Sequence, residues 1–98
     1  MNSRLQGSIG LAMKAGALVS GDFASEKTLA AGKAKLVLLD PECSEATRER
    51  YGHLCSKREI PILYVEALGE RIGKPERKIA VVTDVNFQTM ILRAAGEA

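Results

Sequence analysis

Hydrophobic residues along this chain recur at the spacing of helix faces in some stretches and form short continuous runs in others. Helical spacing over residues 2–15 is carried by Leu5, Ile9, Ala12 and Met13. A last helix is predicted after its N-cap Asp84, and the residues expected to lie against a sheet are Phe87, Met90, Ile91 and Ala94. Three more helices are predicted at 22–31, 45–58 and 68–72, bounded by glycine, proline or capping residues. The helix at 45–58 begins at the N-cap Ser44, and its inward residues are expected to include Ala46 and Leu54.

Four aliphatic runs of strand length lie between these helices, at 17–20, 35–39, 62–65 and 79–83. The second run contains Leu-Val-Leu-Leu without interruption, a pattern typical of a strand that is covered on both faces. Because helices and strands alternate from end to end, we expect an α/β fold in which a central sheet carries helices on both faces. No linker or internal repeat interrupts the 98 residues, so residues 1–98 are expected to form one domain.

The composition excludes several classes of protein. Hydrophobic residues make up 46% of the chain and charged residues 27%, which are the proportions of a globular protein and not of a disordered one. No apolar run approaches the roughly 18 residues that a membrane span needs, and polar residues interrupt the first stretch where a signal peptide would be apolar. We therefore expect a cytoplasmic protein without a membrane partner.

The charge balance limits how the chain could bind nucleic acid. Its 14 basic and 12 acidic residues leave a net charge of +2, so a polyanion would have to be held by a local basic patch. With two tyrosines, two phenylalanines and no tryptophan, binding that stacks several bases on a sheet of aromatic rings is disfavoured. Two basic clusters occur at predicted loop ends, and their members are Lys27, Lys33 and Lys35, and Lys74, Arg77 and Lys78. Solvated loop lysines are the alternative interpretation.

Residues suited to catalysis or metal binding are few. His53 is the only histidine, and Cys43 and Cys55 are the only cysteines, which gives three ligands where a structural zinc ion usually takes four. No nucleophile, base and orienting group are apparent together. Residues 16–23 have the glycine spacing of a phosphate-binding loop, but Asp-Phe stands where Lys followed by Ser or Thr is needed. We therefore expect reduced thiols, no metal, no cofactor and no enzymatic activity.

One stretch of the chain suits an anion. The predicted helix start at Gly21 presents unpaired backbone N–H groups and the positive end of the helix dipole, and Lys27 lies on the following turn. Gly21 also allows close approach by another backbone. These features favour a weak phosphate site, with an ordinary strand-to-helix turn and a surface lysine as the alternative.

Five segments taken in order carry a family resemblance, and they are LAMKAGALVSG (11–21), GKAKLVLL (32–39), IPILYV (60–65), LGERIGK (68–74) and IAVVTD (79–84). Over nearly its whole length the chain resembles the L-seven-Ae ribosomal-protein family of kink-turn RNA binders, and most closely the bacterial YlxQ-like branch. The resemblance implies a three-layer α/β/α sandwich with a central four-stranded mixed sheet. It also implies that RNA is bound by the turn entering the second helix, here 21–27, and by the loop before the last strand, here 72–78. In the family these two segments meet at one end of the sandwich.

The chain departs from the family pattern at positions that read RNA bases. Gly21 and Lys27 match the Gly and Lys of the family's G-x-N-E-x-x-K signature, whereas Phe23 and Ala24 replace its Asn and Glu. Neither side chain can form the base-edge hydrogen bonds by which Asn and Glu recognise sheared G·A pairs. We therefore expect phosphate contacts to supply much of the RNA affinity, with Phe23 stacking on an unpaired base. The residues implied for RNA binding are Gly21, Asp22, Phe23, Ala24, Lys27, Lys33, Ile72, Lys74, Arg77 and Lys78.

Two functions are left open by the sequence. The first is a non-enzymatic, ribosome-associated protein whose partner is structured RNA, with ribosomal RNA as a candidate. The second is a protein–protein interaction module that kept the fold after losing kink-turn recognition, which is favoured by Phe23, Ala24 and Glu76 at read-out positions. An enzyme built around His53 ranks third. The chain is expected to be bacterial in origin and to act as a monomer.

Overall fold

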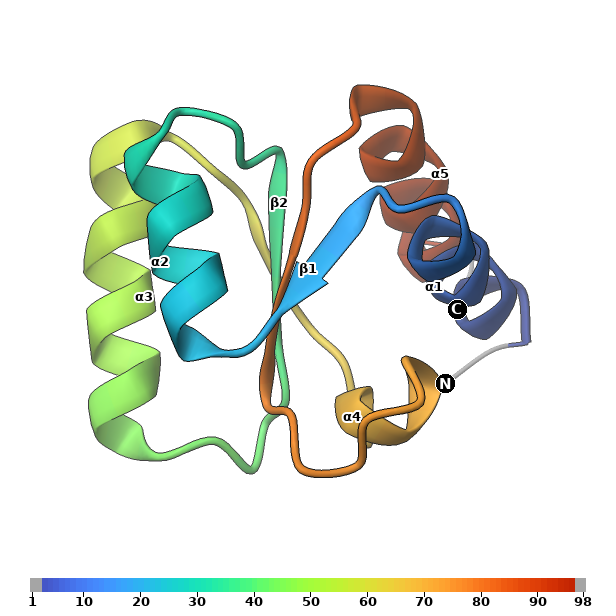
Figure 1. Cartoon of the computed structure of the whole chain (residues 1–98), viewed down its shortest axis with the longest axis horizontal. Coiled ribbons are helices and arrows are strands. Elements are labelled where there is room, and N and C mark those ends of the chain that lie inside the picture. Colours follow the sequence, from blue (N-terminus) through green and yellow to red (C-terminus); the bar gives the residue numbers. More distant parts are fainter. Residues whose placement is uncertain (1–2, 97–98) are drawn as a thin grey trace.

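The computed structural model describes residues 3–96, which form helices packed on both sides of a four-stranded sheet (Figure 1). The helices are α1 (Ser3–Lys14), α2 (Asp22–Ala30), α3 (Glu45–Arg58), α4 (Leu68–Arg71) and α5 (Val85–Gly96). The strands are β1 (Leu18–Ser20), β2 (Leu36–Leu39), β3 (Ile62–Tyr64) and β4 (Ile79–Val82). All predicted elements are present in the predicted order; Asn2, expected at the start of the first helix, lies outside the described residues.

The sheet is mixed, as the resemblance implied. Its strand order is β1-β4-β2-β3, with β2 and β3 parallel and β4 antiparallel to both of its neighbours. Helices α2 and α3 cover one face, whereas α1 and α5 cover the other, with α4 at the end of that second layer (Figure 1). The predicted three-layer α/β/α sandwich is therefore confirmed.

The central strand β2 explains the uninterrupted aliphatic run in the sequence. Leu36 and Leu38 pack toward the α1 and α5 layer, whereas Val37 and Leu39 pack toward α2 and α3. All four side chains are 0% exposed, because successive residues of a strand point to opposite faces of a sheet. Both halves of the core thus depend on this one strand.

Two expected core positions are wrong. Met90 is 42% exposed because it lies about 100° around α5 from Ile91, which with Ala94 faces the sheet. Ala46 in α3 is exposed, and the buried stripe of that helix is formed by Tyr51 and Cys55 instead. The inward face of α3 is therefore rotated from the one expected.

The predicted caps of two helices are confirmed. The Ser44 hydroxyl oxygen accepts a hydrogen bond from the Thr47 N–H at 3.1 Å at the start of α3. The Asp84 carboxylate accepts hydrogen bonds from the N–H groups of Asn86 and Phe87 at 2.7 and 3.3 Å at the start of α5. Within residues 3–96, no helix combines the length and the apolar character that crossing a bilayer requires.

Candidate functional site

The two segments expected to bind RNA meet at one end of the sheet. The Gly21 N–H donates a hydrogen bond to the Ile79 carbonyl at 2.9 Å, and Arg77 Nη1 donates one to the Ser20 carbonyl at 3.0 Å. In Figure 1 the turn from β1 into α2 and the loop from α4 into β4 both lie in the lower half of the view. We call residues 20–27 and 72–78 together the rim.

Gly21 fixes the contact between the two halves of the rim. Its φ of 93° and ψ of 157° lie in a region that side chains disfavour, and a Cβ there would overlap the guanidinium group of Arg77. Its own N–H is used by Ile79, so the expectation of a free Gly21 amide is wrong. The backbone N–H groups available to a ligand are those of the first turn of α2. Among the described residues, no side chain caps this turn.

Asp22 is held by two residues of α3 that the sequence did not indicate. Its carboxylate pairs with Arg50 Nη2 at 2.8 Å and accepts a hydrogen bond from the Tyr51 hydroxyl at 2.8 Å. The Arg50 guanidinium lies over the Tyr51 ring, 5.1 Å from its centroid. The hydrogen bond from Arg50 lowers the pKa of the Asp22 carboxyl, whereas burial, followed by the bond to Asp22, raises the pKa of Tyr51. These contacts with Arg50 and Tyr51 orient the N-terminus of α2 and hold the Asp22 side chain toward α3.

Replacing Asp22 by asparagine will reduce stability more at neutral pH than in acid. The lowered pKa means that the carboxylate stabilises the fold above about pH 4 and that this contribution is lost as the pH falls further. Since half of the side chain is exposed, we expect a loss of only about 0.5–1 kcal/mol near neutrality. Urea unfolding at neutral pH and at a pH below about 4 measures the stability loss of the variant. Glu49→Gln, at an exposed position on α3, is the control. Equal losses for Asp22→Asn at both pH values would contradict the assignment.

Phe23 lies in the first turn of α2, and Lys27 lies one turn farther along the helix, in its last turn. They are four residues apart, so their side chains lie on the same side of the helix. Phe23 is 81% exposed, which leaves its ring accessible for stacking, and Lys27 is also exposed. Ala24 is partly exposed but has no polar side-chain atom. This part of the rim therefore offers one ring and one cation but no side chain that reads a base edge.

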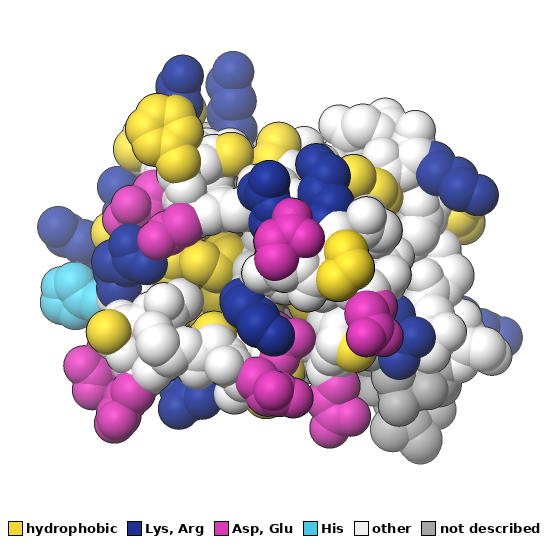
Figure 2. All heavy atoms as spheres, turned by 60° about the horizontal axis from the view of Figure 1, so that its bottom comes forward, with side chains coloured by type: hydrophobic (Ala, Val, Ile, Leu, Met, Phe, Trp, Pro, Cys, Tyr) yellow, Lys and Arg dark blue, Asp and Glu magenta, His cyan; other side chains and the backbone are white. Residues whose placement is uncertain are grey.

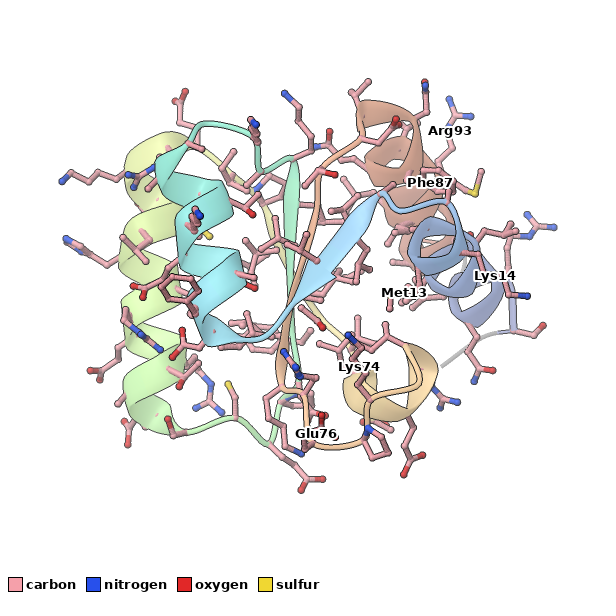
Figure 3. All side chains as sticks on the ribbon, in the orientation of Figure 1. Met13, Lys14, Lys74, Glu76, Phe87 and Arg93 are labelled. Atoms are coloured by element: carbon pink, nitrogen blue, oxygen red, sulfur yellow. The ribbon has the colours of Figure 1, made fainter. Side chains whose placement is uncertain are left out.

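The loop 72–78 is braced against α4. The Lys74 N–H donates to the Gly69 carbonyl at 2.8 Å, and the Arg77 N–H donates to the Lys74 carbonyl at 2.9 Å. A Cβ at Gly69 would come within 2.5 Å of the Lys74 carbonyl oxygen, so the glycine permits this close packing. Ile72 is 5% exposed and packs in the core, and it therefore anchors the loop and has no free surface for RNA. Figure 3 shows Lys74 and Glu76 on the loop at this end of the molecule.

Acidic residues share the rim with its cations. Figure 2 shows Lys and Arg side chains interspersed with Asp and Glu over this end of the molecule. Arg77 Nε lies 3.4 Å from the Glu76 carboxylate, and Lys78 Nζ lies 3.9 Å from the Asp40 carboxylate. Among the residues the structure describes, Lys27 and Lys74 have no carboxylate within 4.0 Å. These two lysines are thus the cations most available to an external anion.

Lys33 does not join the rim. It follows the C-terminal end of α2, where its N–H donates to the Thr28 carbonyl at 3.1 Å. Figure 1 shows α2 running away from the rim, so the two ends of this helix face opposite edges of the molecule. The structure brings together the other implied residues, although Ile72 takes part only through the core.

Asp40, whose role no sequence pattern indicated, forms hydrogen bonds that support the loop 72–78 of the rim. Its side chain is 4% exposed and accepts hydrogen bonds from the N–H groups of Glu42 at 2.8 Å and Leu68 at 3.2 Å. Its own N–H donates to the Lys78 carbonyl at 2.9 Å. Asp40 therefore connects the end of β2 with the start of α4 and with the loop.

The described residues contain no group of three or more His, Cys, Asp or Glu side chains placed to hold a metal ion. Cys43 and Cys55 are both free and buried. Burial raises the pKa of the Cys55 thiol, which makes it a poor nucleophile.

Residues 3–93 match the model of the "Ribosomal protein L7Ae/L30e/S12e/Gadd45 family". The chain is 34% identical over 87 residues to the "RNA-binding protein YlxQ" of Bacillus subtilis (strain 168), covering 86% of this chain and 87% of that protein. It is 37% identical over 82 residues to the protein of the same name from Enterococcus faecium, covering 81% and 79% of the two chains. The sequence-based resemblance to this family is confirmed.

Two solved structures share the fold. A protein of unknown function from Bacillus halodurans has a TM-score of 0.87 at 27% identity, covering 94% of this chain and 96% of that one. The Giardia lamblia 15.5kD RNA binding protein has a TM-score of 0.75 at 16% identity, covering 99% and 89%. The second likeness concerns the fold alone.

Proposed function

Because the chain belongs to the ribosomal protein L7Ae/L30e/S12e/Gadd45 family, we propose that it is a non-enzymatic protein that binds structured RNA at the rim. The observation that carries this proposal is the meeting of residues 20–27 and 72–78 at one end of the sheet, with Lys27, Lys74 and Phe23 exposed there. The names of the two YlxQ relatives support RNA as the ligand. The RNA is a kink-turn-like or other folded element, with ribosomal RNA as a candidate, and the protein acts as a cytoplasmic monomer.

Phosphate contacts supply most of the affinity in this proposal. Lys27 and Lys74, neither of which forms an ion pair with a described carboxylate, bind backbone phosphates, and the uncapped first turn of α2 supplies N–H donors. Arg77 is shared between the Ser20 carbonyl, Glu76 and the RNA. Phe23 stacks on an unpaired base, which adds affinity but discriminates weakly among sequences. We expect broader selectivity than that of family members with Asn and Glu at positions 23 and 24.

Reversing the charge of Lys27 or Lys74 will weaken RNA binding by about tenfold each at near-physiological salt, because a phosphate contact is replaced by repulsion. Filter-binding titrations with hairpin RNAs that contain tandem G·A pairs measure this effect. Lys33→Glu makes the same charge change at the far end of α2 and should alter the affinity less than twofold. If Lys33→Glu were as damaging as Lys27→Glu, the rim would not be the binding surface.

A protein-interaction module is the second candidate, and it is favoured by one observation. Phe23, the most exposed large hydrophobic residue among those described, stands beside Ala24 where the family has polar base-reading residues. A protein partner that remains bound after nuclease treatment and is lost in Phe23→Ala would support this function. The RNA proposal fails if no structured RNA binds at low salt.

A further inference from the structure

Arg50 on α3 lies outside the rim, yet it contacts both carboxylates of the rim segment 20–27. The two acidic residues of that segment are Asp22 and Glu26, which are four residues apart and therefore lie on the same side of α2. Arg50 Nη2 lies 2.8 Å from the Asp22 carboxylate, and Arg50 Nη1 lies 3.5 Å from the Glu26 carboxylate. One guanidinium group thus bridges the two carboxylates, which the planar fork of an arginine permits.

The contact with Asp22 is the more firmly held of the two. Each oxygen of its carboxylate has a partner on α3, because Oδ2 pairs with Arg50 and Oδ1 accepts a hydrogen bond from the Tyr51 hydroxyl at 2.8 Å. Tyr51 is 0% exposed, so its hydroxyl holds the carboxylate from a fixed position in the core. Glu26 is half-exposed and, among the described residues, forms its ion pair with Arg50 alone. Removal of Arg50 would therefore release Glu26 and leave Asp22 with one anchor.

The position of Asp22 makes this release important for an anion at the rim. Asp22 is the first residue of α2, and no described side chain caps that turn. A carboxylate in the first turn of a helix is attracted to the same N–H groups and the same end of the helix dipole that attract a phosphate. An Asp22 side chain that no longer pairs with Arg50 would compete for these donors, and its charge would repel the RNA backbone.

We propose that Arg50 is a positioning residue for RNA binding, which draws the carboxylates of Asp22 and Glu26 toward α3 and so leaves the rim open to phosphate. This inference rests on the RNA-binding function proposed above. Arg50 acts through the two carboxylates and not by contact with RNA, because its guanidinium group is already shared between them and the Tyr51 ring, 5.1 Å from the ring centroid.

The test is a mutant cycle measured by filter binding of a hairpin RNA with tandem G·A pairs. Arg50→Gln should weaken binding about fivefold at near-physiological salt, because two uncompensated carboxylates then face the phosphates. The Asp22→Asn, Glu26→Gln double variant should bind at least as tightly as the wild-type chain. Adding Arg50→Gln to that double variant should change the affinity less than twofold, because no carboxylate is left to be drawn away.

Two variants separate this role from a general effect of charge or of folding. Lys57→Gln removes the same charge from an exposed position on α3, two turns farther from the rim, and should change the affinity less than twofold. The triple variant Asp22→Asn, Glu26→Gln, Arg50→Gln lacks the same ion pairs between α2 and α3 as Arg50→Gln does. If these pairs mattered only because they hold α2 in place, the triple variant would bind as weakly as Arg50→Gln.

Three results would overturn the proposal. An equal loss of affinity from Arg50→Gln in the wild-type and double-variant backgrounds would mean that Arg50 contacts RNA itself or only supports the fold. Unchanged affinity in Arg50→Gln would mean that the two carboxylates do not reach the RNA site. Failure of the RNA-binding function has a different outcome, since neither the wild-type chain nor the double variant would then bind the hairpin, and both proposals would fall.

Discussion

The Gly21→Ala variant will bind structured RNA at least tenfold more weakly and will be less stable by about 1–3 kcal/mol. The added Cβ would occupy the space of the Arg77 guanidinium, which must then leave the Ser20 carbonyl. The backbone at φ 93° and ψ 157° is also strained for any residue with a Cβ. Displacement of Arg77 removes the side-chain contact between the two halves of the rim and moves a cation of the rim, and for this reason the RNA affinity falls as well as the stability.

Gly32→Ala is the matched control for this change. Gly32 also has a positive φ, of 73°, but a Cβ there would meet nothing within 4 Å. We expect a stability loss of about 1 kcal/mol from backbone strain alone, with RNA affinity unchanged. Filter binding and urea unfolding of both variants separate the two effects. Equal RNA affinities in Gly21→Ala and Gly32→Ala would show that the contact between Arg77 and Ser20 is not needed.

Replacing Asp40 by alanine will cost about 2–3 kcal/mol of stability and will weaken RNA binding. The buried Leu68 N–H and the Glu42 N–H lose their acceptor, and an unsatisfied buried donor carries a desolvation penalty of about 1–3 kcal/mol. Because Asp40 joins β2 to the start of α4, the loop 72–78 also loses part of its support. Urea unfolding and RNA titration measure the two effects.

Asp84→Ala provides the comparison for Asp40. Asp84 also accepts hydrogen bonds from two backbone N–H groups, but they cap α5, which begins beyond the end of β4 that lies away from the loop 72–78, and the site is partly exposed. We expect a loss of about 1 kcal/mol and no change in RNA affinity. If Asp40→Ala cost no more than Asp84→Ala, Asp40 would be an ordinary cap and not the support of the rim.

The fold could be predicted because its elements have strong local signals. The uninterrupted run at β2 indicated a strand buried on both faces, and capping residues located the starts of α3 and α5. Met90 was misplaced because a residue at the border of a helical stripe fits the same spacing as one at its centre. The resemblance implied the mixed sheet, since the spacing of apolar residues does not specify which strands pair.

The site was less predictable because its contacts join distant parts of the chain. Asp22 and Tyr51 are 29 residues apart, and nothing local to either indicates the hydrogen bond between them. The spacing of Tyr51 and Cys55, four residues apart on α3, was the one available sign that this face is buried. Lys33 was grouped with Lys27 because the two lysines are close in sequence, although Lys27 lies on α2 one turn beyond Phe23 and Lys33 follows the C-terminal end of that helix.

Whether the rim binds RNA is tested most directly by amide chemical-shift mapping of the full chain during titration with a G·A-containing hairpin. The largest shifts should fall in residues 21–27 and 72–78 and should disappear in the Lys27→Glu, Lys74→Glu double variant. The amides of α1 and α5 should move little. Shifts concentrated on α3 or on the α1 and α5 layer, with the rim unmoved, would contradict the claim.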